Sequence, residues 1–505
     1  MAPPPITTTV SSILASSSPT SMAALLIGLT TFLLLLQKLH RALTSPLRAL
    51  PGPAWSHVTH LPLKLANISG QRVHHIHGLH ARYGPVVRIA PDEVAVADAR
   101  AVRAIHKPGG GFEKSAWYKK FVRGNAEGMF DMVDAKRHAA RRRLFARAFG
   151  KGEVRGRWEG MVREKVELAV RRMGEELRRG EDSDCMKWWT FLATDVSGHL
   201  MFGESFRMLE LGKKNEYIET LESTMMGSGI RAELPLLAAV GKLIPHPKLQ
   251  AMFNANDRLL AYGTRAITSG KDEGANGQGA SIFAQLDPDA QRESPFPFTD
   301  LDVRVEAGNL IVAGADTTAV SLTYLTHAVL ARPELQRALE EEVGSGLQDG
   351  FGDRECEALP LLNAVVNETL RMYGAAPGSL PRTVPPGGAT LAGHFLPAGT
   401  TVSTQAWSLH RDEGLWPDPE RFDPYRWLSL PPNTSPSSMS FMPFGAGTRI
   451  CLGLHLALME LRLATAVFFR ELKGVRLSER TTPESMDVVN FFLIMPKSGR
   501  CYIKI

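Results

Sequence analysis

The sequence predicts a mainly α-helical protein with a small β region, and three observations support this fold class. Most segments between about residues 135 and 480 place apolar residues at helical spacing. The stretch from Asp302 to Ala331 has no proline and few charges, which predicts a helix of about 45 Å that crosses the core. Strand-like alternation is concentrated in residues 85–98, on either side of Pro91, and predicts a short hairpin.

The composition is that of an ordinary globular protein. The chain has 505 residues, of which 44% are hydrophobic and 22% charged, and its length alone favours two or more domains. Its net charge of +6 is spread over 58 basic and 52 acidic residues, which gives no reason to expect a nucleic acid partner. The four cysteines form no CxxC pair, so neither a disulfide framework nor a structural zinc site is predicted.

The N-terminus has the pattern of a membrane anchor. Residues 1–20 are biased toward Ser, Thr and Pro and predict a disordered tail, whereas residues 21–37 carry no charge and predict a transmembrane segment. A cleaved secretory signal is disfavoured, because no basic region precedes the apolar run and no small-residue cleavage site follows it.

A basic, proline-rich hinge is predicted over residues 38–53, which end in Pro51-Gly52-Pro53. Lys38 and Arg41 follow the apolar run, and no Lys or Arg precedes it. The positive-inside rule therefore predicts a single-pass anchor, with residues 54–505 forming a body in the cytosol.

Two segments of the body have unusual composition. Basic residues are dense in one helical stretch, where they predict either a solvated helix face or a site for an anion or a partner: Lys136, Arg137, His138, Arg141, Arg142 and Arg143. The Gly-, Lys-, Asp- and Gln-rich segment 269–280 predicts an exposed loop.

The long central helix contains a polar interruption, Ala313-Gly-Ala-Asp316-Thr317-Thr318. A charge and two hydroxyls inside an apolar helix are costly, which indicates that they have a purpose. Thr hydroxyls can bond to the preceding turn and bend a helix, and Gly314 leaves room for a small ligand beside the backbone. A pair of Thr residues that caps a kink is the alternative interpretation.

A second helix is predicted from about Leu361 to Tyr373, and Glu368 and Arg371 lie on one face of it. Their apolar neighbours predict a semi-buried ion pair. A third helix, from Leu452 to about Arg470, follows a glycine-rich loop.

That loop carries five spaced residues: Phe444, Gly447, Arg449, Cys451 and Gly453. Glycines let the backbone approach a flat ligand and adopt positive φ angles. The N-terminus of the following helix presents amide donors and a partial positive charge to the Cys451 sulfur, which favours a thiolate. A structural cysteine in a glycine-rich turn is the alternative.

These five residues match in full the FxxGxRxCxG signature of the cytochrome P450 superfamily, and the resemblance extends over roughly residues 50–505. It implies the fold of that family, with haem b held between the long central helix and the helix that follows the Cys loop. By this resemblance Cys451 is the axial iron ligand, Phe444 packs beside it, and Arg449 meets a haem propionate.

Other positions match further motifs of the family. Thr317 and Asp316 resemble its oxygen-activation pair, in which the threonine assists dioxygen binding and the acid assists proton delivery. His138 and Arg142 resemble the propionate-binding helix, with His138 in place of the usual tryptophan. Arg382, in Leu-Pro-Arg, resembles a third propionate ligand on a strand.

Glu368 and Arg371 match the family's structural ExxR motif, which a downstream arginine completes. Arg421 and Arg426 are both candidates in Pro417-Asp-Pro-Glu-Arg421-Phe-Asp-Pro-Tyr-Arg426-Trp. The family's second Pro-x-x-aromatic step holds this arginine, which favours Arg426, although Tyr425 replaces the common glutamate.

The resemblance implies a haem-thiolate monooxygenase that inserts one oxygen atom from O2 into a hydrophobic small molecule. The chain has no GxGxxG fingerprint, so NADPH would act indirectly, through NADPH-cytochrome P450 reductase at the endoplasmic reticulum membrane. The basic Arg141–Arg143 cluster is a candidate docking face. The resemblance to fungal members suggests a terpenoid or polyketide substrate.

Two rival functions remain. One is a haem-thiolate isomerase or dehydratase that needs no external electrons, whose expected mark is loss of the Asp-Thr pair that this chain keeps. The other is a catalytically silent protein that binds haem or lipid.

Overall fold

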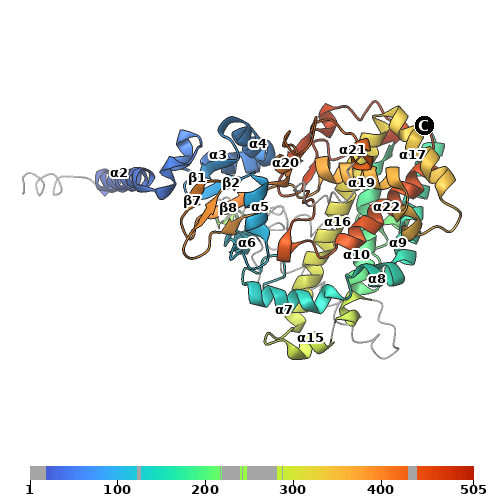
Figure 1. The fold of residues 1–505 in the computed structure, drawn as a ribbon, viewed down its shortest axis with the longest axis horizontal. Coiled ribbons are helices and arrows are strands. Elements are labelled where there is room, and N and C mark those ends of the chain that lie inside the picture. The colour runs from blue at the N-terminus through green and yellow to red at the C-terminus, as the bar shows by residue number, and fades with distance from the viewer. Residues whose placement is uncertain are drawn as a thin grey trace, which may run out of the picture.

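The structure is a computed structural model that describes residues 19–121, 127–215, 218, 239–241, 243–246, 281–286, 288–429 and 441–505. Figure 1 shows helix α2 projecting from one end of a body made of helices and small sheets. The mainly α fold with a small β region is confirmed. Almost all of the predicted N-terminal tail and the whole predicted loop 269–280 lie outside the described residues.

Most of the body is helical. Its longer helices are α4 (Arg72–Tyr83), α7 (Ala135–Ala146), α9 (Glu159–Arg178), α10 (Cys185–Phe202), α16 (Asp300–Leu330), α17 (Pro333–Gly346), α19 (Pro360–Tyr373) and α22 (Leu454–Glu471). Its shorter helices include α3 (Leu61–Ile68), α5 (Ala99–His106), α6 (Trp117–Phe121), α8 (Lys151–Glu153), α11 (Met208–Leu211), α15 (Pro288–Glu293), α18 (Asp353–Glu357), α20 (Ala406–Leu409) and α21 (Tyr425–Leu428).

The strands are short. They are β1 (Val86–Ala90), β2 (Glu93–Val96), β3 (Glu113–Lys114), β4 (Ser183–Asp184), β5 (Arg382–Thr383), β6 (Ala389–Leu391), β7 (His394–Leu396), β8 (Thr401–Thr404), β9 (Arg476–Leu477), β10 (Val488–Asn490), β11 (Ile494–Pro496) and β12 (Tyr502–Lys504). The largest sheet has the order β1-β2-β8-β5-β3.

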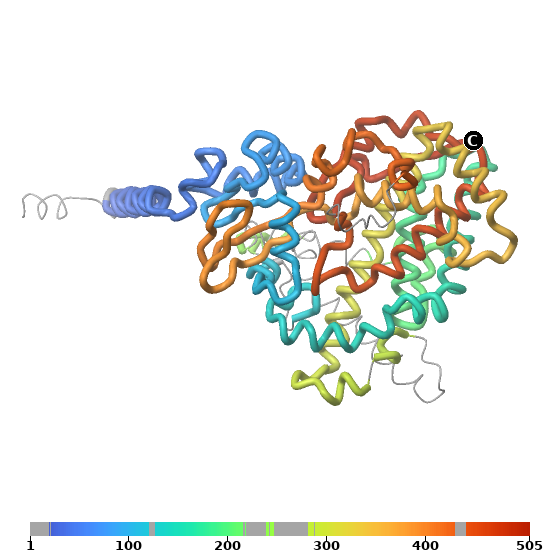
Figure 2. Tube along the Cα trace, viewed as in Figure 1, coloured from blue at the N-terminus to red at the C-terminus, as the bar shows by residue number. Residues whose placement is uncertain are grey.

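This five-stranded sheet joins distant parts of the chain. β1 and β2 form the predicted antiparallel hairpin, and β2 pairs in parallel with β8, where Glu93 lies opposite Thr401. In Figure 2 the blue N-terminal trace therefore runs beside the orange trace of β8. At the other edge β3 pairs with β5, which places Lys114 directly opposite Arg382.

Helix α16 is the predicted long central helix. It begins with a capping box, in which the Thr299 hydroxyl accepts from the Asp302 amide and the Asp302 carboxylate accepts from the Thr299 amide. Residues 318–330 are almost continuously buried against α10, α19 and α22, whereas residues 300–312 are mostly half-buried.

The buried apolar residues form a main core and smaller ones. The main core surrounds α9, α10, α16, α19 and α22, and a second lies between the five-stranded sheet and α5. In Figure 1, α16 runs between the part of the molecule that contains β1, β2 and β8 and the larger part that contains most of the helices.

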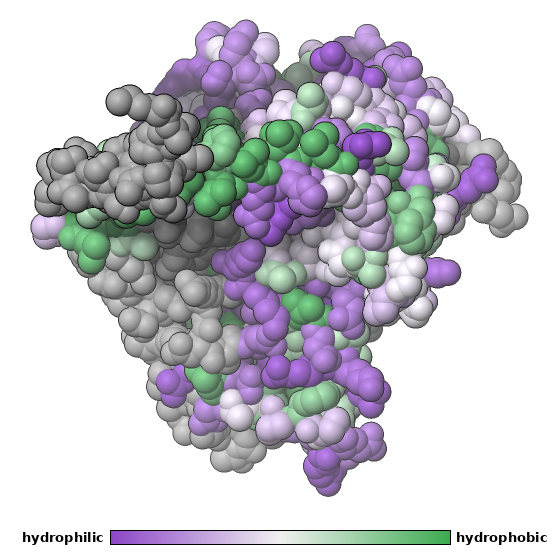
Figure 3. Space-filling view, turned by 90° about the vertical axis from the view of Figure 1, so that its left-hand side faces the viewer, coloured by the Kyte–Doolittle hydropathy of each residue, from purple (hydrophilic) through white to green (hydrophobic). Residues whose placement is uncertain are grey.

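Helix α2 is the predicted apolar segment. Its residues Met22–Thr44 have a mean hydropathy of 1.9, and it is the one helix among the described residues that is long and apolar enough to cross a membrane. The helix continues past Gln37 to Thr44, into the range predicted as the hinge. Figure 3 shows hydrophobic residues gathered on the end of the molecule that carries α2, above a largely hydrophilic lower part.

Candidate active site

The Cys loop is held in one conformation by its backbone. Gly447 has a φ of +67°, and a Cβ at this position would lie 1.8 Å from the His106 carbonyl oxygen, so no other residue fits. The Cys451 amide donates to the Phe444 carbonyl over 2.9 Å and closes the turn. Helix α22 begins directly afterwards, at Leu454, so Cys451 lies at its N-terminal end as predicted.

Cys451 is the exposed member of the four cysteines, while Cys185, Cys356 and Cys501 are buried. The surrounding protein nevertheless desolvates the Cys451 thiol, and this burial raises its pKa. The Gly453 backbone and the Arg142 charge lower the same pKa, as expected for a thiolate site, but burial outweighs them. The helix N-terminus thus acts on the sulfur in the predicted direction, and desolvation opposes it.

Basic side chains converge beside this loop, and we call them the cation cluster: Lys114, His138, Arg142, Arg382 and Arg449. Burial, together with the charges of the other four members, lowers the pKa of His138 to about 3. Burial and the Arg382 charge lower the pKa of Arg449 to about 10. These effects place the five side chains within electrostatic reach of one another.

Acidic residues near the cation cluster, such as Glu113 and Asp134 near Arg449, act on it at longer range only. Within the described part of the chain, no ion pair joins any of its members to a carboxylate. Instead, Arg449 donates to the carbonyls of Met132 and Val133 over 2.7 and 2.9 Å, and Arg142 donates to the Ile450 carbonyl over 2.7 Å. Basic side chains that converge next to an exposed cysteine fit the two carboxylates of a haem b whose iron the sulfur would bind.

Sequence reasoning missed Lys114. The side chain is 8% exposed, its Nζ donates to the Phe130 carbonyl, and burial lowers its pKa well below the usual range. Its proximity to Arg382 comes from the pairing of β3 with β5, two strands that are far apart in the sequence. No local pattern around residue 114 could have indicated it.

The polar segment 313–318 of α16 agrees with the prediction at Thr317 and differs from it at Gly314. The Thr317 hydroxyl donates to the Ala313 carbonyl over 2.6 Å, as expected for a threonine that bonds to the preceding turn. The prediction that Gly314 leaves room for a ligand is wrong, because a Cβ there would lie 2.5 Å from the Ser197 hydroxyl of α10. Gly314 therefore serves the close packing of α10 against α16.

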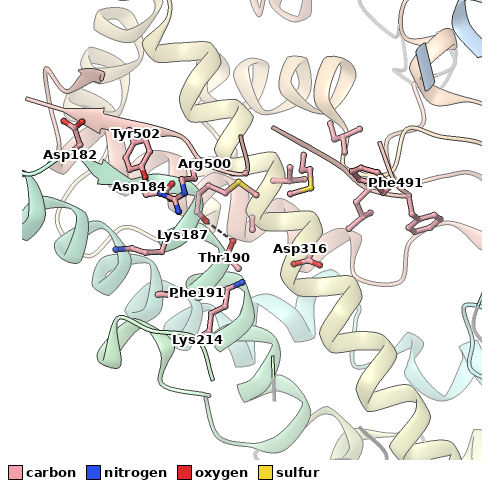
Figure 4. Close-up of a pocket in the computed structure, with 18 of the residues that line it drawn as sticks. Asp182, Asp184, Lys187, Thr190, Phe191, Lys214, Asp316, Phe491, Arg500 and Tyr502 are labelled. Carbon is pink, nitrogen blue, oxygen red and sulfur yellow. Dashed lines mark hydrogen bonds between the residues drawn. The ribbon is translucent and has the colours of Figure 1, made fainter. Parts of the chain in front are cut away.

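A cavity of about 1170 Å³ borders α16 at Asp316. Figure 4 shows Asp316 and Phe491 apart from the charged side chains of Asp184, Lys187 and Arg500. The apolar part of the wall comes from α3, α10, α16 and the β10–β11 hairpin: Ile68, Met186, Phe191, Ala319, Val320, Phe491, Phe492, Leu493, Ile494 and Met495. Asp316 and residues 491–493 of the β10–β11 hairpin thus share one cavity.

A buried acid lies behind the same part of α16. Glu460 of α22 is 2% exposed and bonds to the Thr318 hydroxyl, and burial raises its pKa to about 8. Glu460 is therefore largely protonated at neutral pH. The sequence did not single it out, because nothing local shows that Glu460 lies behind Thr318 of α16.

Glu368 and Arg371 form a fully buried ion pair with two parallel hydrogen bonds of 2.9 Å. Arg426 completes the network, with its Nε 3.1 Å from the Glu368 carboxylate. Arg421 contributes only its carbonyl oxygen, which accepts from Arg371 over 3.3 Å. The structure therefore selects Arg426 of the two candidates.

This network reaches the Cys loop through His410. Arg371 Nη1 donates to the His410 carbonyl over 2.6 Å, and the Arg371 carbonyl lies 2.9 Å from His410 Nδ1. His410 Nε2 accepts from the Met442 amide, at the start of the coil that leads to Cys451. The Glu368–Arg371 pair thus supports the position of the loop from behind.

The basic run on α7 serves two purposes. Arg141 is buried and pairs with Asp302 at 2.8 Å and with Glu306 at 2.9 Å, so its inclusion in a docking face is wrong. Lys136, Arg137 and Arg143 are exposed, while His138 and Arg142 belong to the cation cluster.

The fold and the site define a haem-thiolate protein, with a cysteine before a core helix, a cluster of cations beside it and a cavity along the central helix. The family model described as Cytochrome P450 matches residues 50–501, and the chain belongs to this family. This match to one family model extends over most of the chain.

Relatives in fungi support the activity. The chain is 39% identical over 469 residues to the cytochrome P450 monooxygenase cypX of Dothistroma septosporum, covering 91% of both chains. It is 42% identical over 475 residues to the cytochrome P450 monooxygenase tazI of Aspergillus terreus, covering 94% of this chain and 96% of the relative. A more distant relative, at 30% over 403 residues, is the methylphloroacetophenone oxidase of Cladonia uncialis, covering 76% and 86%. The chain is a monooxygenase and an oxidoreductase whose family binds haem iron.

Proposed function

We propose that the chain is a membrane-anchored monooxygenase that oxidises a hydrophobic polyketide or terpenoid with electrons from NADPH-cytochrome P450 reductase. The observation that carries this proposal is the exposed Cys451 at the start of α22, beside a cation cluster that forms no ion pair with a carboxylate among the described residues. Cys451 Sγ would bind the iron, and Arg142, Arg382, Arg449, Lys114 and His138 would hold the propionates.

Bound haem iron supplies the site at which dioxygen is reduced, so that one oxygen atom enters the substrate and the other leaves as water. Thr317 and Asp316 would serve proton delivery. The Thr317 hydroxyl holds its proton toward the Ala313 carbonyl, while Asp316 lines the cavity and can exchange protons with its water. Phe444 and Gly447 shape the loop around the sulfur, and Gly453 caps the helix that follows.

Electrons would enter on the face of α7. Arg142 on this helix bonds to the Ile450 carbonyl next to Cys451, so the helix and the Cys loop are in contact. The exposed Lys136, Arg137 and Arg143 give that face a positive charge, which suits an acidic surface of the reductase. Association would therefore weaken as the salt concentration rises.

Helix α2 would anchor the protein in the endoplasmic reticulum as a single pass. All of its large apolar side chains from Leu25 to Leu36 are exposed, which is costly in water and favourable in lipid. Lys38 and Arg41 on its C-terminal side favour a cytosolic body, where the reductase and its NADPH are available.

The proposed function can be tested by reconstitution in microsomes with the reductase and labelled dioxygen. The account predicts an NADPH-dependent product that carries one labelled oxygen atom per oxidation. Conversion without NADPH would instead establish an isomerase or dehydratase. Ligand binding without NADPH consumption in haem-loaded protein would establish a silent binding protein.

A further inference from the structure

His106 is a buried histidine whose two ring nitrogens have different surroundings. It is the last residue of α5 and is 7% exposed. Its Nε2 lies 2.7 Å from the Thr404 hydroxyl of β8, whereas its Nδ1 is buried and has no hydrogen-bond partner among the described residues. A buried polar atom without a partner costs free energy, which indicates that a ligand satisfies it.

Hydration alone is the simpler explanation for such a nitrogen, and a comparison with other histidines argues against it. In the described part of the chain, His75, His80 and His327 also have a buried ring nitrogen without a partner. These three residues are half-buried, so water is close to their rings. His106 belongs to the buried class and lies beside the proposed haem site, which makes a cofactor atom the better partner for its Nδ1.

The backbone of His106 touches the Cys loop. A Cβ on Gly447 would lie 1.8 Å from the His106 carbonyl oxygen, so the end of α5 and this loop are in direct contact. Gly447 begins the short turn Gly447–Arg449, which carries one of the proposed propionate ligands. Ala446 of the same loop packs against the second core, to which Ile105 of α5 belongs. The contact therefore fixes where the His106 side chain begins relative to Arg449.

Arg382 of β5 is near the same imidazole. It lies opposite Val402 in the strand ladder, and Val402 and Thr404 are on the same face of β8. Burial lowers the pKa of His106 to about 3, and the Arg382 charge contributes to this shift. His106 is therefore neutral at neutral pH, with one N–H donor and one acceptor nitrogen. The Arg382 charge also acts on Arg449, so the imidazole is close to two of the proposed propionate ligands.

We propose that His106 is a further haem-binding residue, whose Nδ1–H group donates to a propionate while its Nε2 accepts from the Thr404 hydroxyl. This inference rests on the proposed function, since it needs haem at Cys451. A hydroxyl can donate or accept, so Thr404 suits the tautomer that the propionate requires. A neutral donor also adds a hydrogen bond without adding another positive charge beside Arg382 and Arg449, whose charges already oppose each other.

The test is transfer of haem from the haem-loaded full chain to apomyoglobin, together with the resonance Raman bands of the propionate bending modes. His106→Phe keeps a ring without any donor, whereas His106→Asn keeps an N–H group near the position of Nδ1. His327→Phe is the matched control. Its Nδ1 is also buried without a partner among the described residues, and burial lowers its pKa to about 4. It lies about 15 Å along α16 from Thr317.

We expect haem transfer to be roughly tenfold faster in His106→Phe, as for the loss of one hydrogen bond to a carboxylate, and the propionate bands to shift. Transfer should stay within about threefold of the original chain in His106→Asn, and His327→Phe should change neither quantity.

Three results would overturn the role of His106: unchanged transfer and bands in His106→Phe, the same acceleration in His327→Phe, or a tenfold acceleration in His106→Asn, which keeps the donor. These results concern His106 alone, because they are measured on protein that holds haem. An original chain that takes up no haem would instead contradict the proposed function, and this inference with it.

Discussion

The two sides of the proposed haem site are built in different ways. On the Cys451 side, a short loop is fixed by its own backbone bonds, by Gly447 and by the buried Glu368–Arg371 pair. On the cavity side, the wall is assembled from α10, α16 and the β10–β11 hairpin, with several half-exposed side chains. The loop that carries Cys451 is thus made of contiguous residues, whereas the cavity wall, on which substrate choice depends, is made of segments that meet only in the folded chain.

The largest expected effect is on the support behind the Cys loop. Glu368→Ala leaves Arg371 buried without its carboxylate, which should lower the free energy of unfolding by about 3–5 kcal/mol. Glu181→Ala is the control, since Glu181 also pairs with an arginine, Arg179, but the two side chains are 56% and 58% exposed. That change should have little effect on the free energy of unfolding. Urea unfolding measures both, and equal costs would contradict the supporting role.

Two glycine substitutions test how the Cys loop holds its conformation. Gly447→Ala should cost about 2–4 kcal/mol, because the residue has a positive φ and the new methyl group would collide with the His106 carbonyl. Gly453→Ala introduces a methyl group with nothing within 4 Å and should cost about 1 kcal/mol or less. Thermal unfolding and haem content of both proteins test this. A stable, haem-loaded Gly447→Ala variant would show that the loop tolerates another backbone path.

The buried acid behind α16 predicts a pH dependence. Folded Glu460 keeps its proton until about pH 8, whereas the unfolded chain releases it near pH 4.5. Unfolding therefore releases a proton between these values, and rising pH destabilises the folded state in this window. Glu460→Gln should remove about 2 kcal/mol of the difference in stability between pH 6 and pH 8. Parallel pH profiles for the two proteins would mean that Glu460 does not titrate in this way.

A smaller effect is expected in the cation cluster. Lys114→Met removes one repelling charge, so it should stabilise the haem-free protein slightly and weaken haem retention. Transfer of haem to apomyoglobin should be about tenfold faster, as expected for the loss of one charge-assisted hydrogen bond. Slower transfer than in the unmodified chain would show that Lys114 does not face the propionates.

Much of the fold was predictable because it is local. Helix α16 has its own capping box and apolar length, α19 carries its ion pair at i,i+3, and the β1–β2 hairpin alternates around Pro91. The Cys loop was predictable for the same reason, since its glycines and its cysteine are contiguous.

The residues whose roles the sequence did not predict correctly make contacts with distant parts of the chain. Gly314 was assigned to a ligand because the close approach of Ser197 on α10 cannot be seen in the sequence. Arg141 was assigned to a docking face, although Glu306 lies opposite it in the fold. Lys114 was missed because only the pairing of β3 with β5 brings it to Arg382.

The central claim is that Cys451 is the thiolate ligand of haem, and the carbon monoxide difference spectrum of the reduced protein tests it most directly. The account predicts the red-shifted Soret band of thiolate-ligated haem for the unmodified chain and for Cys356→Ser, a buried-cysteine control. The band should be absent in Cys451→Ser. A folded, haem-loaded Cys451→Ser protein that keeps the band would contradict the assignment and the mechanism built on it.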